Sequence, residues 1–122
     1  MDSSESASAL RQEYLRHLLI VRGLSKASVR SYSQDLKSFS NFLNEKKLHL
    51  ERIKEQHVFL YLAFLRRKGL KSRSLARHMA ALRGFYAYLL EKGLIMDDPT
   101  GILENPKLPR LLPRVLSVDE AE

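Results

Sequence analysis

The residues of this sequence most suited to binding chemistry are arginines and lysines in a stretch that contains no acid. No Asp or Glu occurs between positions 66 and 88. The basic residues of this stretch are Arg66, Arg67, Lys68, Lys71, Arg73, Arg77 and Arg83. Guanidinium and ammonium groups in such a run can neutralise phosphates. The stretch therefore favours a polyanionic partner, although a solvated basic helix face with a chance glycine would have the same composition.

Apolar residues within this stretch recur at helical spacing. The residues that predict one buried stripe of an amphipathic helix are Leu75, Met79, Leu82, Tyr86 and Leu89. The residues that fall on the opposite side at 100° per residue are Arg73, Arg77, Ala80 and Gly84. Because Ala and Gly have almost no side chain, the backbone of this face can come close to an anion.

A second polar face lies on the helix that we predict from its N-cap, Ser25, to Lys46. Its predicted buried stripe is Val29, Tyr32, Leu36, Phe39 and Leu43. The opposite face is polar but lightly charged and carries Ala27, Arg30, Ser31, Gln34, Lys37, Ser38 and Asn41. Arg, Gln, Asn and Ser can reach base edges or phosphates in a DNA major groove. An ordinary solvent face is the alternative, but such a face usually carries more Glu and Lys.

Residues that could support catalysis or hold a cofactor are not spaced for either role. The sequence has no Gly-rich phosphate loop, no Ser/His/Asp arrangement and no carboxylate pair placed for acid–base work. His57 and His78 lack a second ligand at i+3 or i+4, and there is no cysteine. We therefore expect neither a metal nor a cofactor.

Length and charge narrow the possible partners. A chain of 122 residues suits one small domain with a modest core. Its formal charge of +7 and sequence pI near 9.9 favour nucleic acid or an acidic membrane surface. No apolar run has the length of a membrane span, and the N-terminus lacks the form of a signal peptide. We expect a cytoplasmic protein with no membrane partner, associated with the nucleoid when bound.

Helical periodicity runs through the first three quarters of the chain, and no strand-like alternation appears. We predict helices over residues 9–22, 25–46, 51–68 and 72–92, after a polar lead at 1–8. The residues that we expect to end the first, third and fourth helices are Gly23, Gly69 and Gly93. Ser72 is the predicted N-cap of the fourth helix. Arg73 would then lie beside the free backbone N–H groups of the first turn, where the two together could bind a phosphate.

The first and third helices have different apolar surfaces. One side of the first helix carries Leu10, Tyr14, His17, Leu18 and Val21. The third helix is apolar in nearly every direction, with Ile53, Val58, Phe59, Leu60, Tyr61, Leu62, Phe64 and Leu65. A helix of this kind is buried centrally or covered by a partner.

The last quarter of the chain has a different composition. Basic residues alternate with prolines there: Pro106, Lys107, Pro109, Arg110, Pro113 and Arg114. Prolines at this density favour an extended, semi-rigid linker. Ser117 followed by Glu120 matches a capping box that begins another helix. We therefore predict a helical domain at 1–96, a linker at 97–115 and the start of a truncated second domain at 116–122.

Three segments together resemble the N-terminal, core-binding domain of tyrosine site-specific recombinases, particularly the bacterial Xer proteins. They are residues 24–36 (LSKASVRSYSQDL), residues 73–86 (ending in LRGFY) and residues 98–113, with DPT, PKLP and LP. The resemblance implies an all-α, four-helix SAM-like orthogonal bundle followed by the Pro-rich linker. It also implies that the second and fourth helices lie in or beside adjacent major grooves of a recombination half-site.

The same resemblance implies strand exchange through a covalent phosphotyrosine, without a metal or nucleotide cofactor. The catalytic residues of the family belong to a second domain, which this chain lacks, so we expect no enzymatic activity here. His49-Leu50-Glu51-Arg52 fits the family's His-x-x-Arg pattern, but it falls in an inter-helix connection and we interpret it as coincidental. Tyr61 is expected to be a core residue. The implied partners are duplex DNA, the missing catalytic domain and other recombinase protomers in a synaptic complex.

We predict DNA contacts from two helices and the linker. Those of the second helix are Ser25, Lys26, Arg30, Ser31, Gln34, Lys37 and Asn41, with Gln34 as the candidate for base contact. Those of the fourth helix and linker are Lys71, Ser72, Arg73, Arg77, Arg83, Lys107, Arg110 and Arg114. The alternatives are a helical protein-interaction module, which binds through its third helix, and a free-standing DNA-binding regulator.

Overall fold

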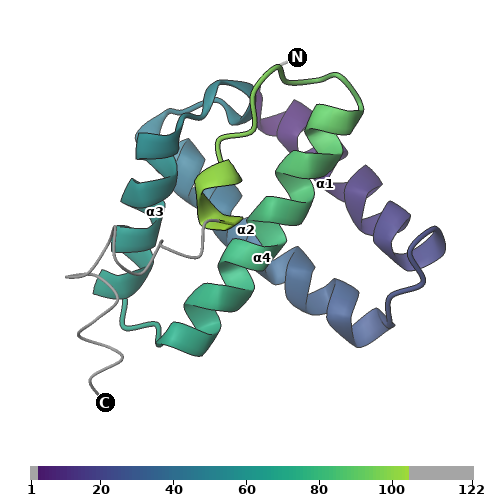
Figure 1. The fold of residues 1–122 in the computed structure, drawn as a ribbon, viewed down its shortest axis with the longest axis horizontal. Helices are drawn as coiled ribbons and strands as arrows, with labels where there is room; N and C mark the ends of the chain where they lie inside the picture. The colour runs from purple at the N-terminus through teal and green to yellow at the C-terminus, as the bar shows by residue number, and fades with distance from the viewer. Residues whose placement is uncertain (1–2, 105–122) are drawn as a thin grey trace. The chain divides into compact units, whose positions relative to one another are not determined.

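A computed structural model describes residues 3–104 of the chain as helices and short connections (Figure 1). The elements are α1 (Ser3–Ile20), α2 (Lys26–Lys46), the 3₁₀ helix η1 (Leu50–Arg52), α3 (Glu55–Arg67), α4 (Ser72–Glu91) and the 3₁₀ helix η2 (Gly101–Glu104). No strand occurs within residues 3–104, so the predicted all-α fold with four α-helices is confirmed. Among these helices, none combines the length and apolarity that a bilayer span requires.

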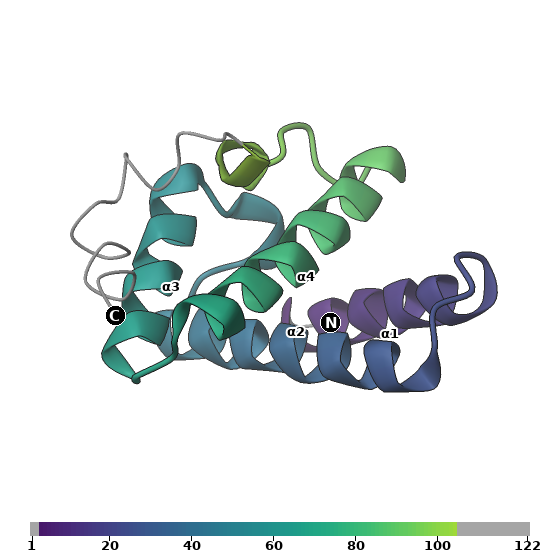
Figure 2. The ribbon, with the colours of Figure 1, turned by 60° about the horizontal axis from the view of Figure 1, so that its bottom comes forward.

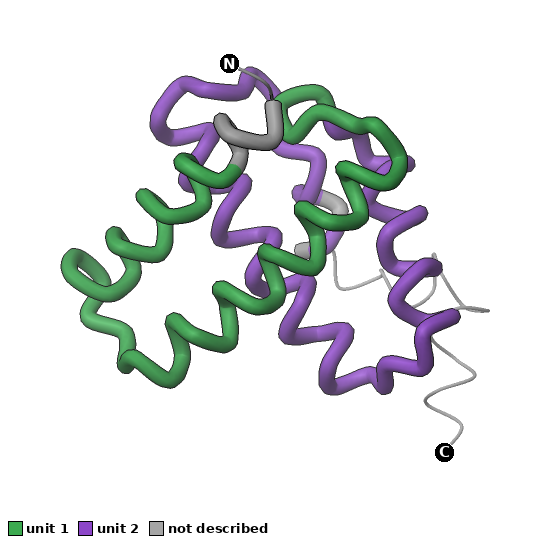
Figure 3. Tube along the Cα trace, turned by 180° about the vertical axis from the view of Figure 1, so that it is seen from behind, with its two compact units in different colours: residues 1–52 green, residues 53–122 purple. Residues whose placement is uncertain are grey.

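The chain divides into two compact units, Met1–Arg52 and Ile53–Glu122 (Figure 3). The first contains α1, α2 and η1, and the second contains α3, α4 and η2. Each unit therefore holds one of the two helices that carry the predicted polar faces.

In the first unit, α1 and α2 run antiparallel and pack against each other (Figures 1 and 2). The large apolar side chains buried in the described part of this unit are Tyr14, Leu18, Leu36, Phe39, Phe42, Leu43 and Leu50. The Nη1 atom of Arg11 donates a hydrogen bond to the Ser40 hydroxyl at 2.8 Å, which links the two helices. Their connecting turn contains Gly23 at φ 70°, a left-handed conformation that costs glycine little.

Tyr14 is the titratable side chain most affected by burial in the first unit. Removal from water raises the pKa of its hydroxyl to about 12, because the phenolate would lose its hydration. The nearby Tyr32 adds to this rise, and the positive charge of Arg22 opposes it. Tyr14 is therefore held in its neutral form well above the usual titration range of tyrosine.

In the second unit, α3 and α4 form a V, and Gly69 at φ 95° lies in the turn that joins them (Figure 1). The buried side chains of α3 are Val58, Tyr61, Leu62 and Leu65. All five residues of the predicted α4 stripe are buried, and so are His78, Ala81, Phe85 and Tyr88 beside them. The apolar surface of α4 is consequently wider than one stripe, which leaves a narrow outward face.

Helix ends account for most differences from the predicted elements. α1 begins at Ser3 rather than at residue 9, so most of the expected polar lead is helical, and Val21 is exposed rather than buried. α3 begins at Glu55 rather than at residue 51, because the Lys54 N–H donates to Nδ1 of His57 at 2.9 Å and closes the first turn there. α4 has Lys71 as its N-cap, so Ser72 is its first helical residue and not its cap.

The residues that follow α4 fold back against this helix. Oδ1 of Asp98 accepts hydrogen bonds from the Thr100 N–H at 2.8 Å and from the Thr100 hydroxyl at 2.6 Å. η2 then packs against α4, and Ile95, Pro99, Thr100 and Leu103 are buried. The proline-rich part of the predicted linker and the predicted capping box lie outside the described residues.

Candidate nucleic-acid interface

The outward face of α2 brings together five residues of the predicted DNA-contact set. Lys26, Arg30, Gln34, Lys37 and Asn41 are all exposed and recur at spacings of three and four residues. At 100° per residue they occupy an arc of about 80° along about four turns of helix. The face is therefore continuous, and its long side chains can all reach the same groove or surface.

The charge of this α2 face is uniformly positive over most of its length. The only acid of α2 before Glu45 is Asp35, which is 3% exposed and lies on the opposite side of the helix. Lys26, Arg30 and Lys37 consequently have no exposed carboxylate of their own helix beside them until its last turn. Gln34 and Asn41 place neutral amide groups between these cations.

The predicted residues at the edge of the α2 face have smaller roles in its surface. Ser31 is half-buried, and Ser25 is exposed at the N-cap, where its hydroxyl accepts a hydrogen bond from the Ser28 N–H at 3.1 Å. Asn44 is exposed three residues after Asn41 on the same arc. The sequence-based set missed Asn44, although its spacing from Lys37 and Asn41 places it on that face.

The outward face of α4 has a different construction. Arg73 and Arg77 are exposed and Arg83 is half-buried, and these arginines border a strip of small side chains. The strip consists of Ala76, Ala80, Gly84 and Ala87. Because no long side chain stands on the strip, an anion that contacts the arginines can approach the helix backbone closely.

The two helices also differ at their N-termini. Ser25 caps α2 through its side chain, whereas Lys71, the N-cap of α4, makes no side-chain cap hydrogen bond. The first turn of α4 contains no acid, and Arg73 lies within it. The helix dipole adds partial positive charge at this end. The N-terminus of α4 therefore adds backbone donors to the basic face, although not with Ser72 as its cap.

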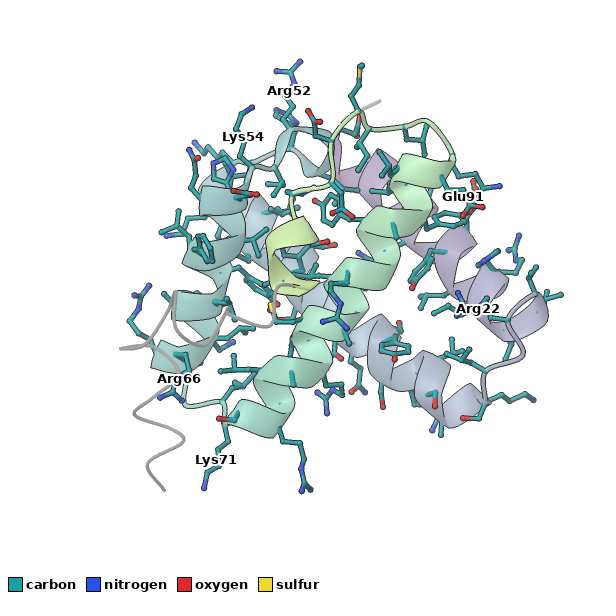
Figure 4. The ribbon with its side chains drawn as sticks, in the orientation of Figure 1. Arg22, Arg52, Lys54, Arg66, Lys71 and Glu91 are labelled. Atoms are coloured by element: carbon teal, nitrogen blue, oxygen red, sulfur yellow. The ribbon has the colours of Figure 1, made fainter. Side chains whose placement is uncertain are left out.

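Two basic residues at the end of α3 make contacts within the second unit. Nη1 of Arg66 donates to the carbonyl oxygen of Leu70 at 3.0 Å, across the turn to α4, and Nζ of Lys68 lies 5.2 Å from the centre of the Phe64 ring. Figure 4 shows Arg66 and Lys71 at this turn. Part of the basic run noticed in the sequence thus stabilises a turn, and the outward α4 face depends on Lys71, Arg73, Arg77 and Arg83.

The residues that the sequence analysis considered for metal binding and catalysis can be placed in the described part of the chain. Within residues 3–104, no three or more His, Asp or Glu side chains lie together as a metal site would require. His49-Leu50-Glu51-Arg52 spans η1, a short connection, as predicted. Tyr61 is fully buried and stacks on Phe64 at 6.1 Å, as expected of a core residue.

The structure thus brings the predicted contacts together as two separate sets, one in each unit. The α2 set lies in the first unit and the α4 set in the second. Lys107, Arg110 and Arg114 lie outside the described residues. Each set has the exposure and charge that contact with phosphate requires.

Comparison with known proteins gives one matching family and many similar relatives. The family described as the phage integrase N-terminal SAM-like domain matches residues 12–93. The tyrosine recombinase XerD of Listeria monocytogenes serotype 4b is 33% identical over 93% of this chain and 39% of its own length.

Two further tyrosine recombinases named XerD show the same pattern. The Rhizobium meliloti protein is 35% identical over 96% of this chain, and the Pseudomonas aeruginosa protein is 37% identical over 93%. In both cases the match covers 38% of the relative. The chain therefore spans about two fifths of the length of these relatives. No solved structure matches the chain.

Proposed function

The chain belongs to the phage integrase N-terminal SAM-like domain family, and on that premise we propose that it binds double-stranded DNA as part of a tyrosine recombinase of the XerD type. The resemblance to tyrosine recombinases of the Xer group is confirmed by relatives 33–37% identical over nearly the whole chain. In the proposed reaction, this part recognises a recombination half-site. Strand cleavage and joining are proposed to depend on a separate catalytic domain outside residues 1–122.

The observation that carries the proposal is the pair of outward helix faces that are basic and poor in acid. The α2 face has Lys26, Arg30 and Lys37, and the α4 face adds Lys71 and its arginines. Duplex DNA presents phosphates at regular spacing along each groove edge, so a row of cations on one helix can neutralise several at once. A protein-interaction surface has no comparable requirement for such rows.

The α2 face is proposed to contribute sequence recognition. Gln34 is exposed at the middle of this helix, with Arg30 and Lys37 on either side at i−4 and i+3. Cations in these positions can hold the helix against the backbone while the amide reaches a base edge. Gln forms bidentate hydrogen bonds with adenine N6 and N7, which makes it the proposed base-reading residue.

The α4 face is proposed to bind phosphate without regard to base sequence. Its arginines can contact phosphate oxygens, and the strip of Ala and Gly lets the backbone come close. Lys107, Arg110 and Arg114 are proposed to add further phosphate contacts along the linker. Site-specific recombination, with chromosome dimer resolution as its purpose, would then involve other recombinase protomers in the cytoplasm.

The experiment that tests DNA binding is a titration of a short duplex at several salt concentrations. If about six phosphates are neutralised, the log–log slope should be near −5, and affinity should fall by about 10³-fold between 50 and 200 mM salt. Arg52→Ala is a matched control, because Arg52 is exposed in η1 and belongs to neither face (Figure 4). Affinity that is unchanged by salt would refute the proposal and favour the protein-interaction alternative.

The absence of catalysis from this chain is tested separately. A nicked suicide substrate should form no covalent adduct with the chain, because the family's catalytic residues are expected in another domain. An adduct that disappears in Tyr61→Phe would contradict this part of the proposal. An adduct that remains in that variant would place a nucleophile elsewhere and contradict it as well.

A further inference from the structure

The helix α3 carries apolar side chains on its outward side as well as on its buried side. Its buried residues are Val58, Tyr61, Leu62 and Leu65. On the opposite side, Leu60 is 54% exposed, and the half-buried rings of Phe59 and Phe64 lie on either side of it. Residues 56–65 contain no Lys, Arg, Asp or Glu, so no charge interrupts this side for about three turns. The surface that we call the outer α3 face consists of Phe59, Leu60, Ala63, Phe64 and Arg67.

The charged groups around the outer α3 face stand at its two ends. The exposed ones are Lys54, Glu55, Arg67 and Lys68. Nζ of Lys68 lies 5.2 Å from the centre of the Phe64 ring, and Arg66 donates to the Leu70 carbonyl oxygen at the same end. Cations therefore outnumber the single acid at this border. The middle of the face suits a neutral, apolar occupant, and the border repels any cation that points at it.

Residues 105–112 continue the chain directly from η2, close to α3. In both views η2 lies between α3 and α4 (Figures 1 and 2). At about 3.3–3.6 Å per residue, the seven residues from Glu104 to Leu111 reach up to about 23–25 Å. Half the circumference of a helix about 10–12 Å across is about 16–19 Å. The segment is therefore long enough to pass from the inner to the outer side of α3.

The sequence of this segment matches the outer α3 face in chemistry. Prolines favour an extended backbone, and in a polyproline II helix residues three apart share one ridge. The ridges of residues 106–112 would then be Pro106, Pro109 and Leu112; Leu108 and Leu111; and Lys107 and Arg110. Two ridges are apolar and one is basic. Pro-x-x-Pro segments dock on surfaces lined by aromatic side chains, and Phe59 and Phe64 provide such a lining.

We propose that residues 106–112 dock along the outer α3 face of the same chain. Their two apolar ridges cover Leu60 and the phenylalanines beside it, while Lys107 and Arg110 point away from the basic border. Docking gives the segment one path along the second unit and turns its cations outward. The inference goes beyond DNA binding and does not depend on it. Its tests are made without DNA, so that the two proposals can fail separately.

The first experiment measures where the segment lies. Arg67→Cys carries a nitroxide label at the end of the outer α3 face, and its cysteine is the sole thiol because the chain has none. In the ¹⁵N-enriched labelled chain, amide signals between residues 107 and 112 should broaden strongly, and adding Leu60→Gln should remove most of this broadening. Labelled protein without ¹⁵N, mixed with unlabelled ¹⁵N-enriched protein, should broaden none of them.

Three results of the first experiment would overturn the proposal. Signals that stay sharp in the labelled chain would place the segment elsewhere. Broadening that persists with Leu60→Gln would reflect the short tether and not docking. Equal broadening in the mixture would assign the outer α3 face to a second copy.

The second experiment compares two exposed leucines. Leu60→Gln keeps a good helix former at a largely exposed position, so α3 should be retained. Leu90→Gln is the matched control, because Leu90 is 42% exposed in α4 and lies outside the outer α3 face. The steady-state ¹H–¹⁵N NOE at Leu108 and Leu111 should be that of ordered backbone in the parent, and should fall in Leu60→Gln only. Low values in the parent, no fall in Leu60→Gln, or equal falls in both variants would contradict docking.

The third experiment changes the segment and observes the helix, so it remains decisive even if the helix variant unfolds. Leu108→Gln/Leu111→Gln disrupts an apolar ridge, and Lys107→Gln/Arg110→Gln removes the basic ridge. The first double variant should shift the amide signals of residues 59–64, and the second should leave them in place. Any other pattern, including equal shifts or none, would overturn the proposed docking.

Discussion

The outward faces of α2 and α4 are both basic, but they are built from different side chains. On α2, Gln34 and Asn41 lie between cations, and amides of this kind can distinguish base edges. On α4, Arg73 and Arg77 lie beside Ala and Gly, which have no group that can read a base. Two faces of the same charge thus differ in the neutral side chains between their cations, and this difference is the basis of the separate roles that we propose for them.

The N-termini of the same helices repeat this difference. At α2, the Ser25 hydroxyl satisfies a backbone donor within the chain itself. At α4, Lys71 forms no side-chain cap and places an ammonium group at the positive end of the dipole. The first arrangement stabilises the free protein, whereas the second lowers helix stability and suits an external anion.

The largest expected effect comes from removing the arginines of the α4 face. The double variant Arg73→Ala/Arg77→Ala should lose about 3 kcal/mol of DNA-binding free energy at low salt, from two charge-assisted hydrogen bonds. The loss should be equal for specific and scrambled duplexes, and the salt slope should fall by about two units. Anisotropy titrations at two salt concentrations give both quantities. Arg52→Ala/Lys54→Ala removes the same charge from another surface (Figure 4), so an equal loss there would show that net charge, and not the α4 face, is responsible.

The next effect concerns Gln34 and tests the other half of the comparison. Gln34→Ala should lower the preference for a duplex selected from a random-sequence pool by about 1–3 kcal/mol, while affinity for scrambled DNA is nearly unchanged. The parent and the variant are titrated with both duplexes at one salt concentration. Gln56→Ala is the matched control, because Gln56 is an exposed glutamine of α3 that belongs to neither face. Equal loss for both duplexes would show that α2 does not read bases.

The titration of Tyr14 makes the stability of the first unit, which carries the α2 face, depend on pH. Its pKa is raised from 10.0 to about 12 in the folded protein, so its contribution to stability is complete below pH 10 and is lost as pH rises through 12. At pH 11 the unfolded state has released this proton and the folded state has not. Unfolding free energy should therefore fall by about 1.4 kcal/mol between pH 9 and 11 through this group.

Tyr14→Phe is the variant that isolates this contribution. Urea unfolding of the parent and of the variant at pH 9 and at pH 11 gives the change in unfolding free energy over this range for each protein. Any effect of the lost hydroxyl that does not depend on pH cancels in this change. The variant should lose less stability over this range than the parent. An identical loss in the two proteins would show that Tyr14 titrates normally.

Ser25→Ala should cost about 1 kcal/mol of unfolding free energy, because the first turn of α2 loses its side-chain acceptor. Preference among DNA sequences should change little, since Ser25 lies at the end of the α2 face. Thermal unfolding together with binding to selected and scrambled duplexes checks both statements. Ser33→Ala, a half-buried serine within α2, is the comparison for loss of a hydroxyl alone.

The smallest effect is expected from Lys71→Ser, which gives α4 the kind of cap that α2 has. Stability should rise by about 0.5–1 kcal/mol through the new cap, while DNA affinity falls and the salt slope decreases by about one unit. Opposite signs for stability and binding are the result to look for. A variant that gains stability and binds DNA as before would show that the N-terminus of α4 is not at the phosphates.

The core and the two faces could be predicted from the sequence because they depend on periodicity. Leu75, Met79 and Leu82 are buried at the predicted spacing, and Arg30, Gln34 and Arg77 are exposed. The SAM-like, all-helical fold was predicted through the resemblance and is confirmed by the family match. DNA contact by these residues stays a prediction.

Local backbone conformation and long-range packing account for the errors. Lys71 is the N-cap of α4 because its extended backbone precedes the first helical residue, although its side chain forms no cap hydrogen bond. The preference for serine at N-caps therefore led to the wrong prediction of Ser72. The burial of Asp35 was not predicted, because helical spacing does not reveal which distant groups cover a side chain. Val21 matched the apolar period of α1, but the helix ends at Ile20 and the periodicity no longer applies.

The anchoring of residues 97–104 against α4 shortens the tether to whatever follows. An extended chain spans at most about 3.3–3.6 Å per residue, so holding these eight residues removes no more than about 26–29 Å of reach. A shorter tether confines a linked domain to a smaller volume and raises its effective concentration near the same DNA. For the linked catalytic domain of the proposed function, the hydrogen bonds from Thr100 to Asp98 would thus influence how often that domain meets its target. Loosening them should slow that encounter without altering any residue that touches DNA.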